Sequence, residues 1–323
     1  MVKYAEKKGY EKGRTVRVDS TVVETNIHRP TDSSLIYDCI RVLSRNVFQL
    51  KELNKNNHLQ ISKLKFSCKL AKNMVLSILN TNNQEKREEI YRDLIVKAGD
   101  NYNQINSYIK VAKSLKKSKK VLKIIEQLAH VKTHLEAILA QTIFRIIDHK
   151  VVKSEEKVVS IFEEHTDVIV KSRREVEFGH KIFLTTGKSN LVLDCQIEQG
   201  NPSDAIKFMD LVNAQNKLYE RFPRQISADG GFSSKDNVLN AKKSGVKDVC
   251  FSKRCGLKIL EIVKSSYVYN KLKNFRAGIE SNISALKRGF GLDRATWKGL
   301  SGYKSYIWSA LVSYNLTILS NKV

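Results

Sequence analysis

The chain has 323 residues, 41% of them hydrophobic, which is enough for one large domain or two ordinary ones with a real core. Its formal net charge of +24, from 57 Lys and Arg against 33 Asp and Glu, indicates a polyanionic partner, above all nucleic acid, because neutralised phosphates release counterions. The absence of a signal peptide, of an apolar run of roughly 20 residues and of any CxxC pair argues against a secreted, membrane or disulfide-stapled protein and predicts a cytoplasmic one.

The first predicted element is a β-like run over residues 16–23, which contains Asp19. Residues 32–150 contain no proline and one glycine, Gly99, so we expect about four helices there. Residues 32–34 offer an N-cap for the first helix, and apolar residues at helical spacing mark the others. The turns between helices are expected near residues 54–57, 80–83 and 99–100.

After residue 150 the pattern changes to short apolar runs separated by turn residues. The expected elements are, in chain order, extended runs at 158–162 and 168–170, a hairpin of 181–186 and 191–197, a helix from 202 to 218, a strand that ends at Asp229, a helix at 233–243, a strand at 248–252 and a terminal helical region. This order is that of an α/β RNase H-like domain, a mixed sheet flanked by helices, with a large all-α insertion after its first strand. The catalytic domain would comprise residues 1–31 and 151–323, and the helical insertion residues 32–150.

Three acids lie in unlike settings that this fold would bring together. Asp19 lies inside a β-run, where a carboxylate is costly to bury unless it is paired or bound to a metal. Asp229 comes before two glycines at the carboxyl end of a strand, where ligands gather in α/β sheets. Glu280 lies on a predicted helix. Taken singly, the alternatives are a solvated edge residue, an Asp-Gly turn and an ordinary helix ion pair. Together, three carboxylates suit a divalent-metal site for phosphoryl transfer.

The helix with Glu280 carries the strongest signal. Arg276 precedes Glu280 by four residues and Lys287 follows it by seven, so the three side chains share one helix face. This Arg-x3-Glu-x6-Lys pattern and its flanking residues 274–294 resemble the signature around the last acid of DDE transposases of bacterial insertion sequences. Residues 19–32 and 178–181 resemble the same family.

The resemblance implies a transposase that cleaves DNA at the ends of its element and transfers the strands to a target. Asp19, Asp229 and Glu280 would hold two Mg²⁺ ions, for which Mn²⁺ would substitute. The partner would be double-stranded DNA, held by two copies of the chain in a paired-end complex near the nucleoid of a bacterium or archaeon. The residues assigned to DNA contact are Arg276, Lys287, Lys273, Arg288 and His180.

The sequence departs from the family pattern in two places. A tyrosine is usual three residues before the arginine, where this chain has Lys273; Phe275 is the candidate for its packing role. Family members usually carry a helical DNA-binding domain before the first acid, whereas eighteen residues precede Asp19 here. We therefore expect the catalytic part of a truncated or interrupted element. The alternative function is a non-catalytic, DNA-binding remnant of a transposase.

Other candidate features have simpler explanations. His130 and His134 are four apart on a predicted helix, a spacing that can bind zinc, but no third ligand with usable spacing is evident. His180 suits a structural role as well as DNA contact. The lysine run over residues 113–123 suits a solvated helix face as well as phosphate contact. The C-terminal aromatic residues favour core packing over base stacking. Glycine-rich phosphate loops are absent, which argues against an ATPase or dinucleotide enzyme.

Overall fold

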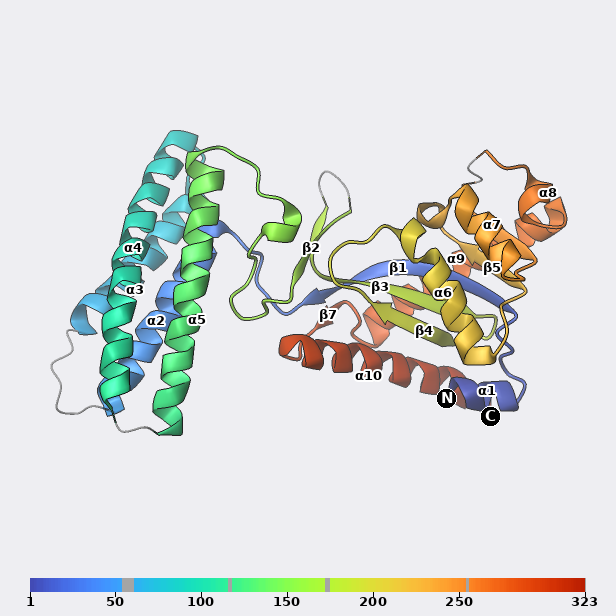
Figure 1. The fold of residues 1–323 in the computed structure, drawn as a ribbon, viewed down its shortest axis with the longest axis horizontal. Helices are drawn as coiled ribbons and strands as arrows, with labels where there is room; N and C mark the ends of the chain where they lie inside the picture. Colours follow the sequence, from blue (N-terminus) through green and yellow to red (C-terminus); the bar gives the residue numbers. More distant parts are fainter. Residues whose placement is uncertain (54–60, 116–117, 172–174, 254–255, 323) are drawn as a thin grey trace. The chain divides into compact units, whose positions relative to one another are not determined.

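The computed structural model describes residues 1–53, 61–115, 118–171, 175–253 and 256–322 (Figure 1). The chain forms two compact units. One comprises Met1–Asn26 and His165–Val323 and holds a mixed sheet flanked by helices, which agrees with the predicted α/β class; the other, Ile27–Glu164, is helical. None of the helices within the described segments is long and apolar enough to span a membrane.

The mixed sheet is built around β1, which spans Thr15–Thr25. It pairs antiparallel with β3 (Val176–Gly187) on one side and parallel with β5 (Gln225–Ala228) on the other. Beyond β5 lies β6 (Asp248–Phe251), again parallel. The remaining strands are β2 (Asp167–Val170) and β4 (Val192–Ile197), both antiparallel to β3, and the two-residue β7 (Arg294–Ala295), parallel to the end of β1. The hairpin predicted from the turn at residues 187–190 is confirmed as β3 and β4.

Helices cover both faces of this sheet. Successive strand residues point to opposite sides, and both sides carry apolar side chains that need a packing partner. Phe183 of β3 packs in one cluster with Phe208 and Phe232, whereas its neighbours Ile182 and Leu184 pack in another. The helices are α1 (Val2–Lys7), α6 (Asp204–Tyr219), α7 (Lys235–Lys243), α8 (Ile259–Ile262), α9 (Ser266–Gly289) and α10 (Gly299–Ser320). The first cluster includes residues of α6 and α7, and the second includes residues of α9 and α10.

The second unit contains α2 (Asp32–Leu53), α3 (Ile61–Asn80), α4 (Gln84–Ser114) and α5 (Lys119–Thr142), followed by a short π-helix, Ile143–Ile147, and a 3-10 turn, Ser154–Glu156. Their apolar stripes share one core, as helical periodicity predicts. Figure 1 shows the four long helices side by side.

Two details of the predicted helices are wrong. Residues 99–100 do not form a turn, because α4 continues through Gly99. A glycine costs only about 1 kcal/mol in a helix, and the neighbouring Leu94 and Ala98 are buried in the core. The N-cap of α2 is Thr31, whose Oγ1 accepts a hydrogen bond from the backbone N–H of Ser34 at 3.1 Å. The turn predicted at residues 54–57 lies outside the described residues.

The extended run predicted at residues 158–162 does not become a strand. Its Val158 N–H donates to Gln141 Oε1 at 2.9 Å, and Ile161 is buried in the helical core. An apolar run of this length fits a strand or a packed loop equally well, and here the helices supply its partner.

Candidate active site

Two of the three predicted acids lie on neighbouring parallel strands. Val18 of β1 is in register with Ala228, the last residue of β5, so Asp19 and Asp229 follow at the same level. The chain turns after Asp229 into a short 3-10 helix that begins at Gly230. This places the Asp229 carboxylate at the carboxyl end of the strand, where α/β sheets commonly bind ligands.

The third acid reaches the same place from α9. Arg276 Nη1 lies 3.5 Å from Asp229 Oδ1, and Arg276 Nη2 lies 3.0 Å from Glu280 Oε1. The Arg276 side chain is 19% exposed, whereas those of Asp229 and Glu280 are 50% and 64% exposed. One guanidinium thus joins two acids that are 51 residues apart in sequence, and both carboxylates remain open to solvent on one side.

The environments of the two aspartates drive their pKa values apart. Burial raises the pKa of Asp19 to about 6, and the negative charge of Asp229 adds to the effect, while the Ser20 backbone N–H and Arg276 oppose it. Burial acts in the same direction on Asp229, but the Ser252 hydroxyl, at 2.8 Å, and Arg276 outweigh it and lower its pKa. Asp19 therefore lies in a setting where a bound cation stabilises the carboxylate.

The chemistry of the donor set fits a hard divalent cation. Asp19, Asp229 and Glu280 supply carboxylate oxygens, which are the ligands that Mg²⁺ prefers. Like-charge repulsion between Asp19 and Asp229 is what a divalent ion would relieve.

A buried arginine fastens α9 to the sheet beneath the acids. Arg17 lies two residues before Asp19, on the same face of β1, and is only 4% exposed. Its guanidinium donates to Thr186 Oγ1, the Phe275 carbonyl and Asn282 Oδ1 at 2.8–2.9 Å.

The ring of Phe275 also covers the Arg17 guanidinium, with 4.6 Å between Cζ and the ring centroid. Sequence reasoning missed Arg17. The signal that could have identified it is a charged residue inside an apolar strand, two residues before a candidate catalytic acid and therefore on the same face of the strand.

The sequence also matches a known protein family. The family model described as "Transposase DDE domain" matches residues 140–316, more than half of the chain. The chain belongs to the DDE transposase family. No match was found among curated proteins or among solved structures. The resemblance drawn from the signature of α9 is thereby confirmed, and membership of the family implies a DNA substrate and the use of divalent metal ions.

A groove lies beside Glu280 in this DDE transposase. It encloses about 550 Å³ between the second half of α9 and the middle of β1. Its lining includes Ser20, Glu280, Lys287 and Arg288. The ammonium of Lys287 lies 3.6 Å from Asp293 Oδ1, and the Lys287 side chain is 23% exposed. Two of the predicted DNA-contacting cations therefore line a groove that begins at a candidate catalytic acid.

Lys273, another predicted cation on α9, is exposed one turn before Arg276 and does not line the groove. A fourth acid, which sequence reasoning missed, lies near the site. Asp204 at the start of α6 is 2.6 Å from Lys181 Nζ and accepts from Ser20 Oγ at 3.2 Å. Its charge helps to raise the pKa of Asp19. Sequence reasoning passed over Asp204 because an aspartate at the start of a helix is readily explained by helix capping.

The structure does not give His180 a surface for DNA. Its side chain is completely buried, Nδ1 lies 2.7 Å from Asp167 Oδ2, and Nε2 lies 2.7 Å from His165 Nδ1. The backbone N–H of His180 also donates to the Tyr303 hydroxyl. With both ring nitrogens engaged inside the protein, His180 presents no atom to a phosphate in this structure.

The C-terminal aromatic residues and the lysine run are the remaining candidates from the sequence. Tyr303 is 1% exposed and donates to the Val23 carbonyl at 2.7 Å, and Tyr314 is also buried, so these aromatic residues pack in the core. Trp297 and Trp308 are about half exposed. The lysine run is divided between α4 and α5, and its residues 116–117 lie outside the described segments.

Proposed function

We propose that this chain is a transposase that cleaves DNA at the ends of its own element and joins the strands to target DNA. The observation that carries the proposal is that Asp19 and Asp229 lie level on two parallel strands while Arg276 of α9 contacts both Asp229 and Glu280. Three carboxylates on separate elements suit phosphoryl transfer, where catalysis is largely a matter of positioning and charge.

We interpret the unit of Met1–Asn26 and His165–Val323 as an RNase H-like catalytic domain. The sheet order β2-β3-β1-β5-β6, with β4 also on β3 and with β3 antiparallel, supports this interpretation. The helical unit Ile27–Glu164 would then be the insertion after the first strand. The unit boundaries fall after residues 26 and 164, whereas the sequence pattern placed them after residues 31 and 150.

Magnesium, or manganese in its place, would be held by Asp19, Asp229 and Glu280 and would supply charge for the attacking and leaving oxygens of the phosphodiester. The chain's own residues have separate tasks. Asp19 is the acid whose ionisation depends on a nearby cation, since burial and Asp229 oppose its charge. Arg276 orients Glu280 and partly offsets the negative charge.

Positive charge beside the acids would hold the DNA backbone. Lys287 and Arg288 line the groove next to Glu280 and would contact phosphates, Lys287 as a point charge and Arg288 through its planar fork. Arg17 joins β1 to α9 through its hydrogen bonds and would thereby fix the position of Glu280 relative to Asp19.

The test is cleavage of DNA that carries the element's end sequence, with Mg²⁺ and the full chain. Asp229→Asn and Glu280→Gln should each lower the cleavage rate by more than about a hundredfold, beyond what loss of an outer-shell partner of a metal costs. Asp236→Asn, an exposed acid at the start of α7, is the matched control and should leave the rate unchanged. Cleavage that survives both active-site substitutions would refute the assignment, and DNA binding without any cleavage would favour a non-catalytic remnant.

A further inference from the structure

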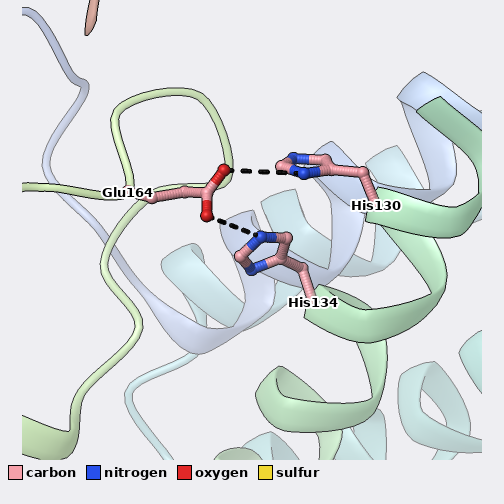
Figure 2. Close-up of side chains that lie close together, drawn as sticks. All are labelled: His130, His134 and Glu164. Carbon is pink, nitrogen blue, oxygen red and sulfur yellow. Dashed lines mark ion pairs between the residues drawn. The ribbon is translucent and has the colours of Figure 1, made fainter. Parts of the chain in front are cut away.

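Two histidines of the helical unit face an acid from a later segment. His130 and His134 lie one turn apart on the same side of α5. Figure 2 shows the carboxylate of Glu164 facing both rings, with one ion pair drawn from each of its oxygens. Glu164 Oε1 lies 3.5 Å from His130 Nδ1, and Oε2 lies 3.2 Å from His134 Nε2. The structure thus brings a third candidate ligand to the two histidines, thirty residues beyond His134, which sequence spacing did not reveal.

The distances suit a small divalent cation. One ligand atom from each of the three residues lies within 4.8 Å of the others. With metal–nitrogen and metal–oxygen bonds of about 2.0–2.1 Å, the ligand atoms of a tetrahedral zinc site are about 3.3 Å apart. The two nitrogen-to-oxygen separations, one to each oxygen of the Glu164 carboxylate, lie on either side of that value.

The hydrogen bond of the His130 ring determines which of its two nitrogens is available as a metal ligand. His130 Nε2 lies 2.9 Å from the Ile161 carbonyl, which only accepts, so in the neutral ring Nε2 carries the proton and the lone pair of Nδ1 faces Glu164. A ring that donates to a carbonyl through its far nitrogen is the usual arrangement of a metal-bound histidine.

The segment that carries Glu164 is already held against α5. Gln141 bonds to both the N–H and the carbonyl of Val158, and the Ser160 hydroxyl accepts from the N–H groups of Phe162 and Glu163. Ile161 is 3% exposed in the helical core. Contacts between this segment and the helical core therefore hold Glu164 near the two histidines, independently of any attraction among the three side chains.

The site is also accessible. Glu164 is 56% exposed, and a pocket of about 410 Å³ is lined by both His130 and Glu164. Arg45 and Glu126 line the same pocket with one charge of each sign. An ion could enter from solvent and keep water in the coordination positions that the protein does not fill.

We propose that His130 Nδ1, His134 Nε2 and the Glu164 carboxylate bind one divalent cation of the zinc class, which fastens the segment after α5 to that helix. Two imidazoles and one carboxylate favour zinc over magnesium, which prefers oxygen alone. The site lies wholly within the helical unit and does not depend on the function proposed for the three acids.

The test is zinc binding by the full chain, without a histidine tag and stripped with EDTA. Asp19→Asn and Asp229→Asn are introduced as a common background, so that the candidate catalytic acids do not contribute. Zinc bound per chain is measured by equilibrium dialysis, and Co²⁺ reports the coordination geometry through its visible spectrum. We expect one zinc per chain and a tetrahedral Co²⁺ spectrum.

The decisive comparison is between matched variants. Glu164→Gln keeps the shape of an exposed side chain and should raise the Kd for zinc at least about tenfold, as should His134→Asn. His149→Asn changes a histidine that is 58% exposed beside Glu88 in the same unit, and should leave the Kd unchanged. No zinc bound by the background protein, or a Kd that Glu164→Gln does not alter, would overturn the proposal. Circular dichroism establishes that each variant is folded, and Glu164→Gln decides the matter if His134→Asn is not.

Discussion

Replacing Gly278 with alanine should misplace Glu280, although the substitution lies in the middle of a helix that alanine would ordinarily favour. Gly278 faces the buried guanidinium of Arg17. A Cβ at this position would lie 2.0 Å from Arg17 Nη1 and 2.9 Å from Cζ. Ordinary contact between such atoms needs about 3.5 Å, so roughly 1.5 Å of separation has to be found.

Arg17 cannot easily provide that space. Its hydrogen bonds to Thr186, Phe275 and Asn282 hold the guanidinium from three sides. Each hydrogen bond to a charged group is worth about 1.5–3 kcal/mol, so α9 is expected to move instead. Overpacking of this kind costs about 1–3 kcal/mol, against a gain of about 1 kcal/mol for alanine over glycine in a helix. The expected net change is a loss of stability of up to about 2 kcal/mol.

The catalytic effect should be larger than the effect on stability. Glu280 lies two residues beyond Gly278, so a shift of α9 by about 1 Å moves its carboxylate relative to Asp19. Misplacement on that scale costs about a hundredfold in rate. The assay combines chemical denaturation with the Mg²⁺-dependent rate of element-end cleavage, measured well below the unfolding temperature.

Gly289→Ala is the matched control, because Gly289 ends the same helix and an added Cβ there meets nothing within 4 Å. It should stabilise the protein by up to about 1 kcal/mol and leave cleavage unchanged. If Gly278→Ala also stabilises the protein and cleaves at the normal rate, the role given to Arg17 and Gly278 is wrong.

Two further predictions concern the charges at the site. The raised pKa of Asp19, about 6 against an ordinary 3.8, means that its charge destabilises the folded state fully above about pH 6 and hardly at all below about pH 4. Asp19→Asn should therefore raise the free energy of unfolding at pH 8 without metal by up to about 3 kcal/mol, and denaturation at pH 4 should show little gain; an equal gain at both pH values would contradict this. Because Arg276 lowers the pKa of Asp19, Arg276→Gln should move the acidic limb of the pH profile of cleavage to higher pH, and Arg276→Lys should move it less. An unshifted profile in Arg276→Gln would show that this limb does not report Asp19.

Much of the candidate active-site region was predictable because its signals are local. The alternation of apolar residues around Asp19, the glycines after Asp229 and the spacing of Arg276, Glu280 and Lys287 each lie within one element. The hairpin of β3 and β4 follows from its turn residues and the apolar runs on either side. Local periodicity indicates which side of an element is buried, and a strand that alternates or a helix that repeats every 3.6 residues leaves few alternatives.

The amino-acid sequence by itself determined the long helices and the β3–β4 hairpin, singled out the three acids as candidates and carried the family signature. Only the tertiary structure decided which side chains from distant elements meet. It set Arg17 against Gly278, brought Asp204 beside Ser20, enclosed His180 between Asp167 and His165, and placed Glu164 against two histidines of α5. None of these pairings has a characteristic spacing, because residues that are far apart in the chain meet through the packing of whole elements, which local patterns do not specify.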